Sequence, residues 1–228
     1  MKILEKQLPL FPLHAVLFPQ ARIPLQIFEP RYIEMIERCL QEDLAFGIVL
    51  IKEGDEVGGP SLPHPVGTVA RIVDVARLHD GRMNIIAAGL TRFKLLESYT
   101  DLPYMTAQIE LWRDEDVDLD KSEKVARQTV KMFRRYVRTI QNVAATEEQE
   151  QAQEEKEFKA PKDPTVLSYL IASHLQVSQP DKQSLLESPT VIARLQREIA
   201  FMGREMQLIR LVSEKTSRIL DQGTFSLN

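Results

Sequence analysis

Apolar residues near the N-terminus are interleaved with prolines. Five prolines stand between Pro9 and Pro30, among Leu, Phe, Val and Ile. Because proline cannot donate a hydrogen bond to a neighbouring strand, this stretch predicts short strands broken by turns. From Pro30 to Leu40 the apolar positions Ile33, Ile36 and Leu40 fall on one helical face, and Pro30 suits the first position of a helix.

The next part of the chain predicts strands. Ala45–Ile51 is nearly all apolar, as in a buried strand, whereas Lys52–Pro65 is rich in Gly, Pro and charge and is expected to be a surface loop. Asp80-Gly81 predicts a tight hairpin because Gly tolerates positive φ. The remaining predicted β segments are Val66–Ala76, Arg82–Leu96 and Tyr104–Trp112.

After the acidic connector Arg113–Asp120 every segment favours helix. Asp120, with Glu123 three residues on, is the predicted N-cap of the first of these helices. One apolar stripe at helical spacing consists of Val125, Thr129, Met132, Tyr136 and Ile140. The chain is therefore expected to be α+β, with a β-rich subdomain at residues 1–118 and a helical subdomain at residues 119–228.

The helical half contains one acidic segment, Glu147–Glu157, in which Ala152 is the only apolar residue. It is either a solvated helix or disordered, and a loop or frayed helix is the favoured prediction. A further helix is expected to start at Asp163-Pro164 and to end near His174. Ser184 with Glu187 forms a second capping-box pattern.

The last helix is predicted to begin at Ser188-Pro189 and to run to Leu220. Its apolar positions step by three and four, as in a heptad seam. They are Ile192, Leu195, Ile199, Met202, Met206 and Ile209. Packing within the chain is favoured over an intermolecular coiled coil, because about three heptads are marginal for association alone.

Composition narrows the classes of protein that fit. A formal net charge of −4 gives no overall attraction to nucleic acid or anionic lipid. Cys39 is the only cysteine, so no intramolecular disulfide can form. No signal peptide or stretch of roughly 20 apolar residues is evident, so a cytoplasmic location is expected.

No catalytic motif is evident in the sequence. No Gly is followed by Lys, as a phosphate-binding loop requires, and neither GxGxxG nor GxSxG occurs. The four histidines are isolated, and Cys39 is expected to be a small core residue. The chain is therefore predicted not to be an enzyme and to hold no metal or cofactor.

Four motifs are more specific. Leu8–Tyr32 contains LPLFPL, an LFP turn and FEPRY, and it is followed by GTVARI from Gly67, DGRMNI from Asp80 and GLTRF from Gly89. In this order and spacing the motifs resemble the N-terminal domain of Lon-type proteases. The resemblance covers about Leu8–Trp112 strongly and implies a PUA-like β pseudo-barrel followed by a helical bundle that ends in a long helix.

The resemblance also implies a function. In such proteases the domain recognises unfolded or tagged polypeptides, whereas the ATPase and peptidase that follow it are not found in this sequence. We therefore expect a stand-alone polypeptide-binding or adaptor module, a monomer or weak oligomer, with a partner in the proteolysis or chaperone system. One alternative is RNA binding through the barrel and the basic segment Lys131–Arg138. The other is a small-molecule sensor.

Candidate residues follow from these motifs. Glu29 is expected to accept from the free amides at the start of the helix that begins at Pro30, and Arg31 to reach a carboxylate or a carbonyl of a neighbouring strand. For both residues a structural role is favoured over ligand binding. The structural motif residues are Glu29, Pro30, Arg31, Gly67, Gly81 and Gly89. The aromatic residues are expected to be mostly core, with two or three lining an open groove, and Arg92 to be a rim contact or an exposed strand residue. The candidate peptide-binding residues are Phe11, Leu17, Phe18, Phe28, Tyr32, Arg92 and Phe93.

Overall fold

A computed structural model describes residues 7–59, 61–115, 118–144 and 158–223 of the chain. The chain divides into two compact units. One comprises Met1–Asp116 with Ala172–Thr190, and the other comprises Val117–Ile171 with Val191–Asn228. Residues 172–190, which the sequence assigned to the helical half, thus group with the β-rich unit, for reasons given by their contacts below.

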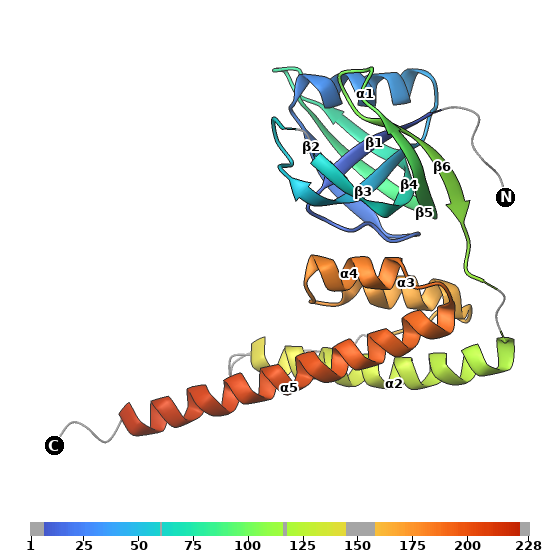
Figure 1. The fold of residues 1–228 in the computed structure, drawn as a ribbon. Coiled ribbons are helices and arrows are strands. Elements are labelled where there is room, and N and C mark those ends of the chain that lie inside the picture. Colours follow the sequence, from blue (N-terminus) through green and yellow to red (C-terminus); the bar gives the residue numbers. More distant parts are fainter. Residues whose placement is uncertain (1–6, 60, 116–117, 145–157, 224–228) are drawn as a thin grey trace. The chain divides into compact units, whose positions relative to one another are not determined.

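The strands of the first unit form one mixed sheet that closes on itself (Figure 1). The strand order is β2-β5-β4-β3-β1-β6, and an additional pairing of β5 with β6 completes a barrel. Neighbours are antiparallel except β1 and β3, which are parallel. The described strands are β1 (Leu8–Leu13), β2 (Arg22–Ile27), β3 (Phe46–Gly54), β4 (Ser61–Arg77), β5 (Met83–Tyr99) and β6 (Thr106–Trp112).

Closure depends on the length of β5. Its first part, Met83–Ala88, pairs with β2, and its second part, Arg92–Tyr99, pairs with β6. Where the partner changes, β5 has a register shift against β4, because Gly89 is opposite Ala70 and Thr91 is opposite Val69. The predicted short strands, the hairpin at Gly81 and the α+β class are confirmed.

The predicted loop Lys52–Pro65 is shorter than the sequence indicates. β3 continues to Gly54 and β4 begins at Ser61, with Ile51 opposite Pro63 and Gly54 opposite Ser61. Main-chain pairing extends a hairpin without requiring apolar side chains, so strand structure persists into polar sequence. Register shifts between Val49 and Glu53 accommodate the irregular residues.

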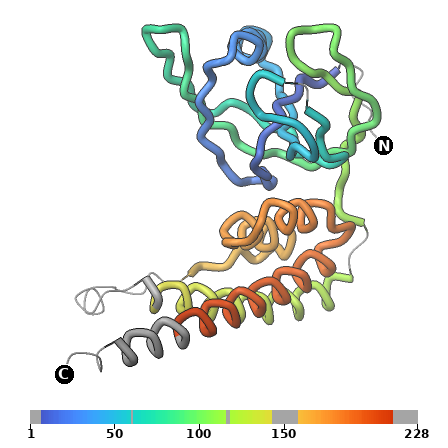
Figure 2. The backbone as a smooth tube through the Cα atoms, turned by 60° about the vertical axis from the view of Figure 1, so that its left-hand side comes forward, coloured from blue at the N-terminus to red at the C-terminus, as the bar shows by residue number. Residues whose placement is uncertain are grey.

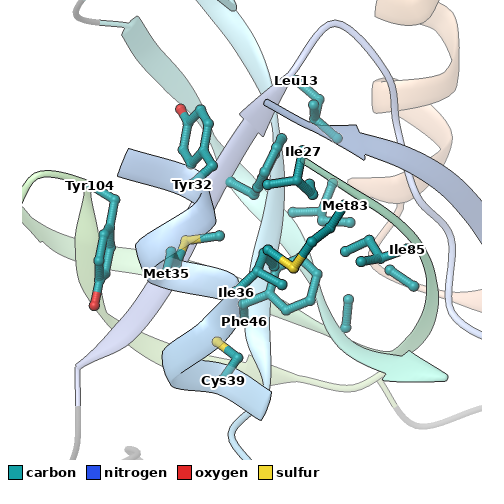
Figure 3. Close-up of a cluster of buried hydrophobic side chains, with 14 of the residues drawn as sticks. Leu13, Ile27, Tyr32, Met35, Ile36, Cys39, Phe46, Met83, Ile85 and Tyr104 are labelled. Atoms are coloured by element: carbon teal, nitrogen blue, oxygen red, sulfur yellow. The ribbon is translucent and has the colours of Figure 1, made fainter. Parts of the chain in front are cut away.

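Helix α1 (Pro30–Gln41) lies against the barrel and buries one face in its larger hydrophobic cluster. Tyr32, Met35, Ile36 and Cys39 are the buried residues of the helix. Figure 3 shows Met35 and Ile36 beside Phe46 from β3 and Met83 and Ile85 from β5. The helix that the sequence predicts from Pro30 therefore covers this core.

The second unit is helical, and its two long helices pack on each other. Residues on one side of α2 are buried, including Val125, Thr129 and Tyr136 of the predicted stripe. On α5 the seam residues Leu195 and Met202 are fully buried, which confirms packing within the chain. The helices described outside α1 are α2 (Leu119–Ala144), α3 (Pro164–His174), α4 (Gln179–Leu186) and α5 (Val191–Gly223).

Three predicted helix starts are wrong in detail. Asp118, not Asp120, caps α2 by accepting from the N–H of Lys121 at 3.1 Å. Ser184 lies inside α4, where its hydroxyl donates to the Asp181 carbonyl. The N-cap of α4 is Ser178. α5 starts at Val191, two residues after Pro189, and the N–H of Ser188 donates to the Leu185 carbonyl of α4. The acidic segment Glu147–Glu157 lies outside the described residues.

Candidate functional site

The start of α1 is tied to the loop between β3 and β4. The Glu29 carboxylate lies 3.0 Å from the Arg31 guanidinium and accepts a hydrogen bond from the N–H of Gly58 at 3.2 Å. Arg31 also approaches the carbonyls of Glu56 and Gly59 at 3.5 Å. We call Glu29, Arg31, Glu56, Gly58 and Gly59 the α1 clamp. Arg31 thus lies against a carboxylate two residues away and against carbonyls of the β3–β4 loop, not against a carbonyl of a neighbouring strand.

Glu29 differs from its predicted capping role. It is the N-cap residue, but its side chain makes no bond to the helix amides. Its backbone carbonyl accepts from Tyr32 and Ile33 instead. The carboxylate is engaged by Arg31 and Gly58, and an oxygen directed outward to the loop cannot also turn back to the first helical turn.

Two large apolar side chains flank the α1 clamp and are exposed. Phe28 precedes Glu29 and is 50% exposed, and Val57 precedes Gly58 and is 56% exposed. The bond between the Glu29 carboxylate and the Gly58 amide joins the chain positions that follow these two residues. The clamp therefore holds both apolar side chains on fixed backbone at the surface of the barrel unit.

The other candidate peptide-binding residues are buried. Phe11 stacks on Tyr32 with ring centroids 4.3 Å apart, and both belong to the larger core cluster. Burial raises the pKa of the Tyr32 hydroxyl. Leu17, Phe18 and Phe93 are also buried, so the expectation that most of these aromatic residues are core is confirmed. A peptide-binding role for any of the seven stays a prediction.

Both predictions for Arg92 are wrong, because its side chain is neither at a rim nor exposed. It is 1% exposed and donates to the carbonyls of Leu186 at 2.6 Å and Ser188 at 2.7 Å. It also pairs with Asp114 at 2.7 Å and lies 4.2 Å above the Trp112 ring. Arg92 therefore joins β5 to the carbonyl end of α4, where a positive charge is favourable.

A second residue fastens α4 to the barrel. Gln183, which is buried, donates to the carbonyl of Val66 in β4 at 3.0 Å and to the Glu187 carboxylate at 2.7 Å. Together with Arg92 it explains why Ala172–Thr190 groups with the β-rich unit. The sequence carries no signal for it, because an isolated Gln more than a hundred positions from its partner has no local pattern.

The three motif glycines have different structural reasons. Gly67 and Gly89 lie where a Cβ atom would collide with main chain, at the carbonyl of Ile48 (2.6 Å) and at the carbonyl of Phe18, respectively. Gly81 has a φ of +83° in the β4–β5 hairpin, as its turn requires. All three are thus needed by the barrel and its connections.

The basic segment Lys131–Arg138 lies on α2. Lys131, Arg134, Arg135 and Arg138 are exposed, whereas Phe133 and Tyr136 are buried. The basic side chains thus form the solvated face of an amphipathic helix.

Two observations on the described residues concern metal binding and the single thiol. No group of three or more His, Cys, Asp or Glu side chains suited to a metal ion occurs among the described residues. Burial raises the pKa of the Cys39 thiol to about 11, which keeps it protonated and unreactive at neutral pH. Of the helices in the described part of the chain, none has the length and hydropathy to cross a membrane.

A closed barrel with a capping helix, an attached helical segment and a unit of long helices defines a class of α+β domains. Residues 7–204 match the family model described as the ATP-dependent protease La (LON) substrate-binding domain. The chain belongs to this family.

Relatives and solved structures agree with this assignment. The chain is 29% identical to Lon protease 2 of Sorangium cellulosum over 227 residues, covering 94% of this chain and 26% of that protein. It is 26% identical to Lon protease of Escherichia coli over 219 residues, covering 95% and 27%. The chain thus spans about a quarter of the length of these curated relatives.

Two solved structures share the fold. A Lon N-terminal domain protein from Xanthomonas campestris is 24% identical with a TM-score of 0.61, over 86% of this chain and 98% of the other. The N-terminal domain of Lon protease from Mycobacterium avium complex is 14% identical with a TM-score of 0.65, over 87% and 98%.

Proposed function

We propose that this chain recognises polypeptides through exposed apolar side chains on its barrel unit and has no catalytic role of its own. The observation that carries the proposal is the pair Phe28 and Val57, both at least half exposed and flanking the α1 clamp. Membership of a substrate-binding domain family supports it. Exposed apolar side chains on rigid backbone are a common feature of protein-binding sites.

Rigidity matters for the affinity of such a site. Binding orders the groups that make contact, and each flexible side chain that is immobilised reduces the affinity. Phe28 and Val57 project from backbone already fixed by the bonds among Glu29, Arg31 and Gly58. Their apolar area is thus available to a partner at low entropic cost, and the interaction is expected to tolerate different sequences.

The test is a titration of fluorescein-labelled, reduced and carboxymethylated α-lactalbumin, followed by anisotropy at low and high salt. We expect weak binding that changes little with salt. Phe28→Ser should weaken binding roughly fivefold, because about half of a Phe side chain's burial, some 1 kcal/mol, is lost. Leu102→Ser is the matched control, since Leu102 is 37% exposed in the same unit but lies between β5 and β6.

A labelled single-stranded RNA in the same titration tests the alternative. The exposed basic side chains of α2 favour this second candidate. RNA binding would weaken steeply with salt, by roughly 0.7 in log affinity per phosphate contact for each tenfold rise in salt concentration. Tight, salt-sensitive RNA binding without polypeptide binding would overturn the proposal. Equal binding by Phe28→Ser and wild type would remove Phe28 from the site.

Three further proposals concern catalysis, the type of barrel and the cellular location of the protein. We propose that the chain hydrolyses neither ATP nor peptides, that the barrel is PUA-like and that the protein acts in the cytoplasm, where the buried thiol of Cys39 stays reduced. ATP-dependent cleavage of casein by the pure protein, abolished by a substitution in this chain, would contradict the first of these.

A further inference from the structure

The outer edge of β4 is open beyond the point where β3 leaves it. The last pair between these strands is Phe46 with Ala70, and from Arg71 to Arg77 β4 pairs only with β5 among the described residues. This part of β4 leads into the hairpin that stands out from the rest of the barrel unit in Figure 2. It contains no Gly or Pro and reads RIVDVAR.

The register shows which backbone groups face that edge. Leu78 donates to the Arg82 carbonyl at 2.8 Å, so Leu78 and Arg82 are a hydrogen-bonded pair. In an antiparallel ladder such pairs alternate with non-bonded ones. The pairs of Arg77 with Met83 and of Val75 with Ile85 are therefore non-bonded, and the N–H and carbonyl groups of Arg77 and Val75 point away from β5.

One of these outward groups is occupied by the chain itself. The N–H of Val75 donates to the carboxylate of the preceding residue, Asp74, at 3.0 Å. No described residue bonds to the outward N–H of Arg77 or to the two outward carbonyls. An exposed carboxylate on this amide is a small, displaceable block in an otherwise open edge.

A second open edge, on β2, is blocked differently. Gly89 donates to the Ala21 carbonyl at 2.9 Å, and the same alternation places Pro24 in a non-bonded pair with Ile86, its nitrogen facing outward. Proline has no N–H, so β2 permanently lacks its central outward donor. Of the two edges, only that of β4 regains a full set of donors when a side chain moves.

We propose that an extended polypeptide binds by adding a strand to the β4 edge at Val75 and Arg77, and that Asp74 competes with it for the Val75 amide. An extended chain is the occupant because only another main chain supplies donors and acceptors at this spacing. The flanking side chains Val73 and Leu78 are 49% and 43% exposed and add apolar contact. Main-chain pairing reads no particular sequence. This inference rests on the proposed polypeptide binding.

The decisive comparison is Arg77→Pro with Arg77→Ala, using the labelled carboxymethylated α-lactalbumin. Both variants lose the bidentate contact of Arg77 with Glu37, but only proline removes the outward N–H, and it breaks no bond to β5. We expect Arg77→Pro to bind roughly fivefold more weakly than Arg77→Ala, the equivalent of one hydrogen bond. Asp74→Ala should bind roughly fivefold more tightly than wild type, and Asp74→Asn, which keeps the acceptor oxygen, should match wild type.

Hydrogen exchange of wild type, measured by NMR, provides a reading that no substitution can disturb. Added polypeptide should protect the amides of Val75 and Arg77 and leave that of Gln26 on β2 unchanged. Equal affinity of the two Arg77 variants with matching circular dichroism, or protection only elsewhere, overturns the inference while polypeptide binding stands. Binding absent in wild type overturns both proposals. Sedimentation tests whether Asp74→Ala dimerises without gaining affinity for polypeptide. That result also overturns the inference, because the β4 edge then pairs with a second copy of the chain.

Discussion

Arg92 offers the sharpest test of how the barrel unit is held together. We consider Arg92→Ala, which removes a guanidinium that donates to the carbonyls of Leu186 and Ser188 and pairs with Asp114. The site is dry, since the side chains of Arg92 and Asp114 are 0% and 9% exposed. Both carbonyls and the carboxylate would lose a charged donor at once.

The expected loss can be worked from these contacts. Removing one partner of a buried ion pair costs about 3–5 kcal/mol, and a buried carbonyl left without its donor costs about 1–3 kcal/mol. The α4 segment can shift and admit water, so the terms do not add in full. We expect the free energy of unfolding to fall by about 4 kcal/mol. Arg92→Lys should lose less, because the lysine ammonium replaces some of the hydrogen bonds of the guanidinium, though not all of them.

Urea unfolding measures this directly. Trp112 is the only tryptophan in the chain, and its ring lies against Arg92, so its fluorescence reports on this unit. Circular dichroism should be recorded in parallel, and coincident transitions justify a two-state treatment. Lys94→Ala is the control, because the Lys94 amine also lies over the Trp112 ring, at 4.4 Å, but is exposed. A loss below 1 kcal/mol, or one no larger than that of Lys94→Ala, would refute the reasoning.

Two further predictions concern single positions. Gly67→Ala should destabilise the protein by about 1–3 kcal/mol in urea unfolding, because its Cβ would lie 2.6 Å from the Ile48 carbonyl oxygen. Gly59→Ala should be nearly neutral, because nothing lies within 4 Å of a Cβ at Gly59. Equal effects of the two substitutions would contradict the close approach at Gly67. Burial raises the pKa of the Glu198 carboxyl well above its usual range, so the folded state holds a proton that unfolding releases. The stability of the protein therefore falls as pH rises above roughly 4.3, the pKa of an unfolded Glu. Glu198→Gln should therefore stabilise the protein at pH 8 in thermal unfolding, with the gain vanishing toward pH 4, and exposed Glu123→Gln should show no such trend.

Local sequence determined the elements whose signals are local. Pro30 starts α1, the prolines in β1, in β2 and in the connection between them keep these strands short, and Gly81 turns the β4–β5 hairpin. In each case the residue restricts or permits a backbone dihedral of its own, so no distant partner is needed. The family motifs likewise identified the class of domain, because their glycines and prolines mark fixed backbone positions.

Tertiary structure decided where side chains end up relative to water. Arg92 and Phe93 are neighbours on the same strand. The sequence predicts that Arg92 is exposed, but it is buried because it donates to the carbonyl of Leu186, which lies 94 residues later in the chain. Phe28 reads as core yet is half exposed, in the short connection between β2 and α1. Barrel closure by β5 and β6, and with it the open edge of β4, depends on pairing between distant segments, which the period of a sequence does not encode.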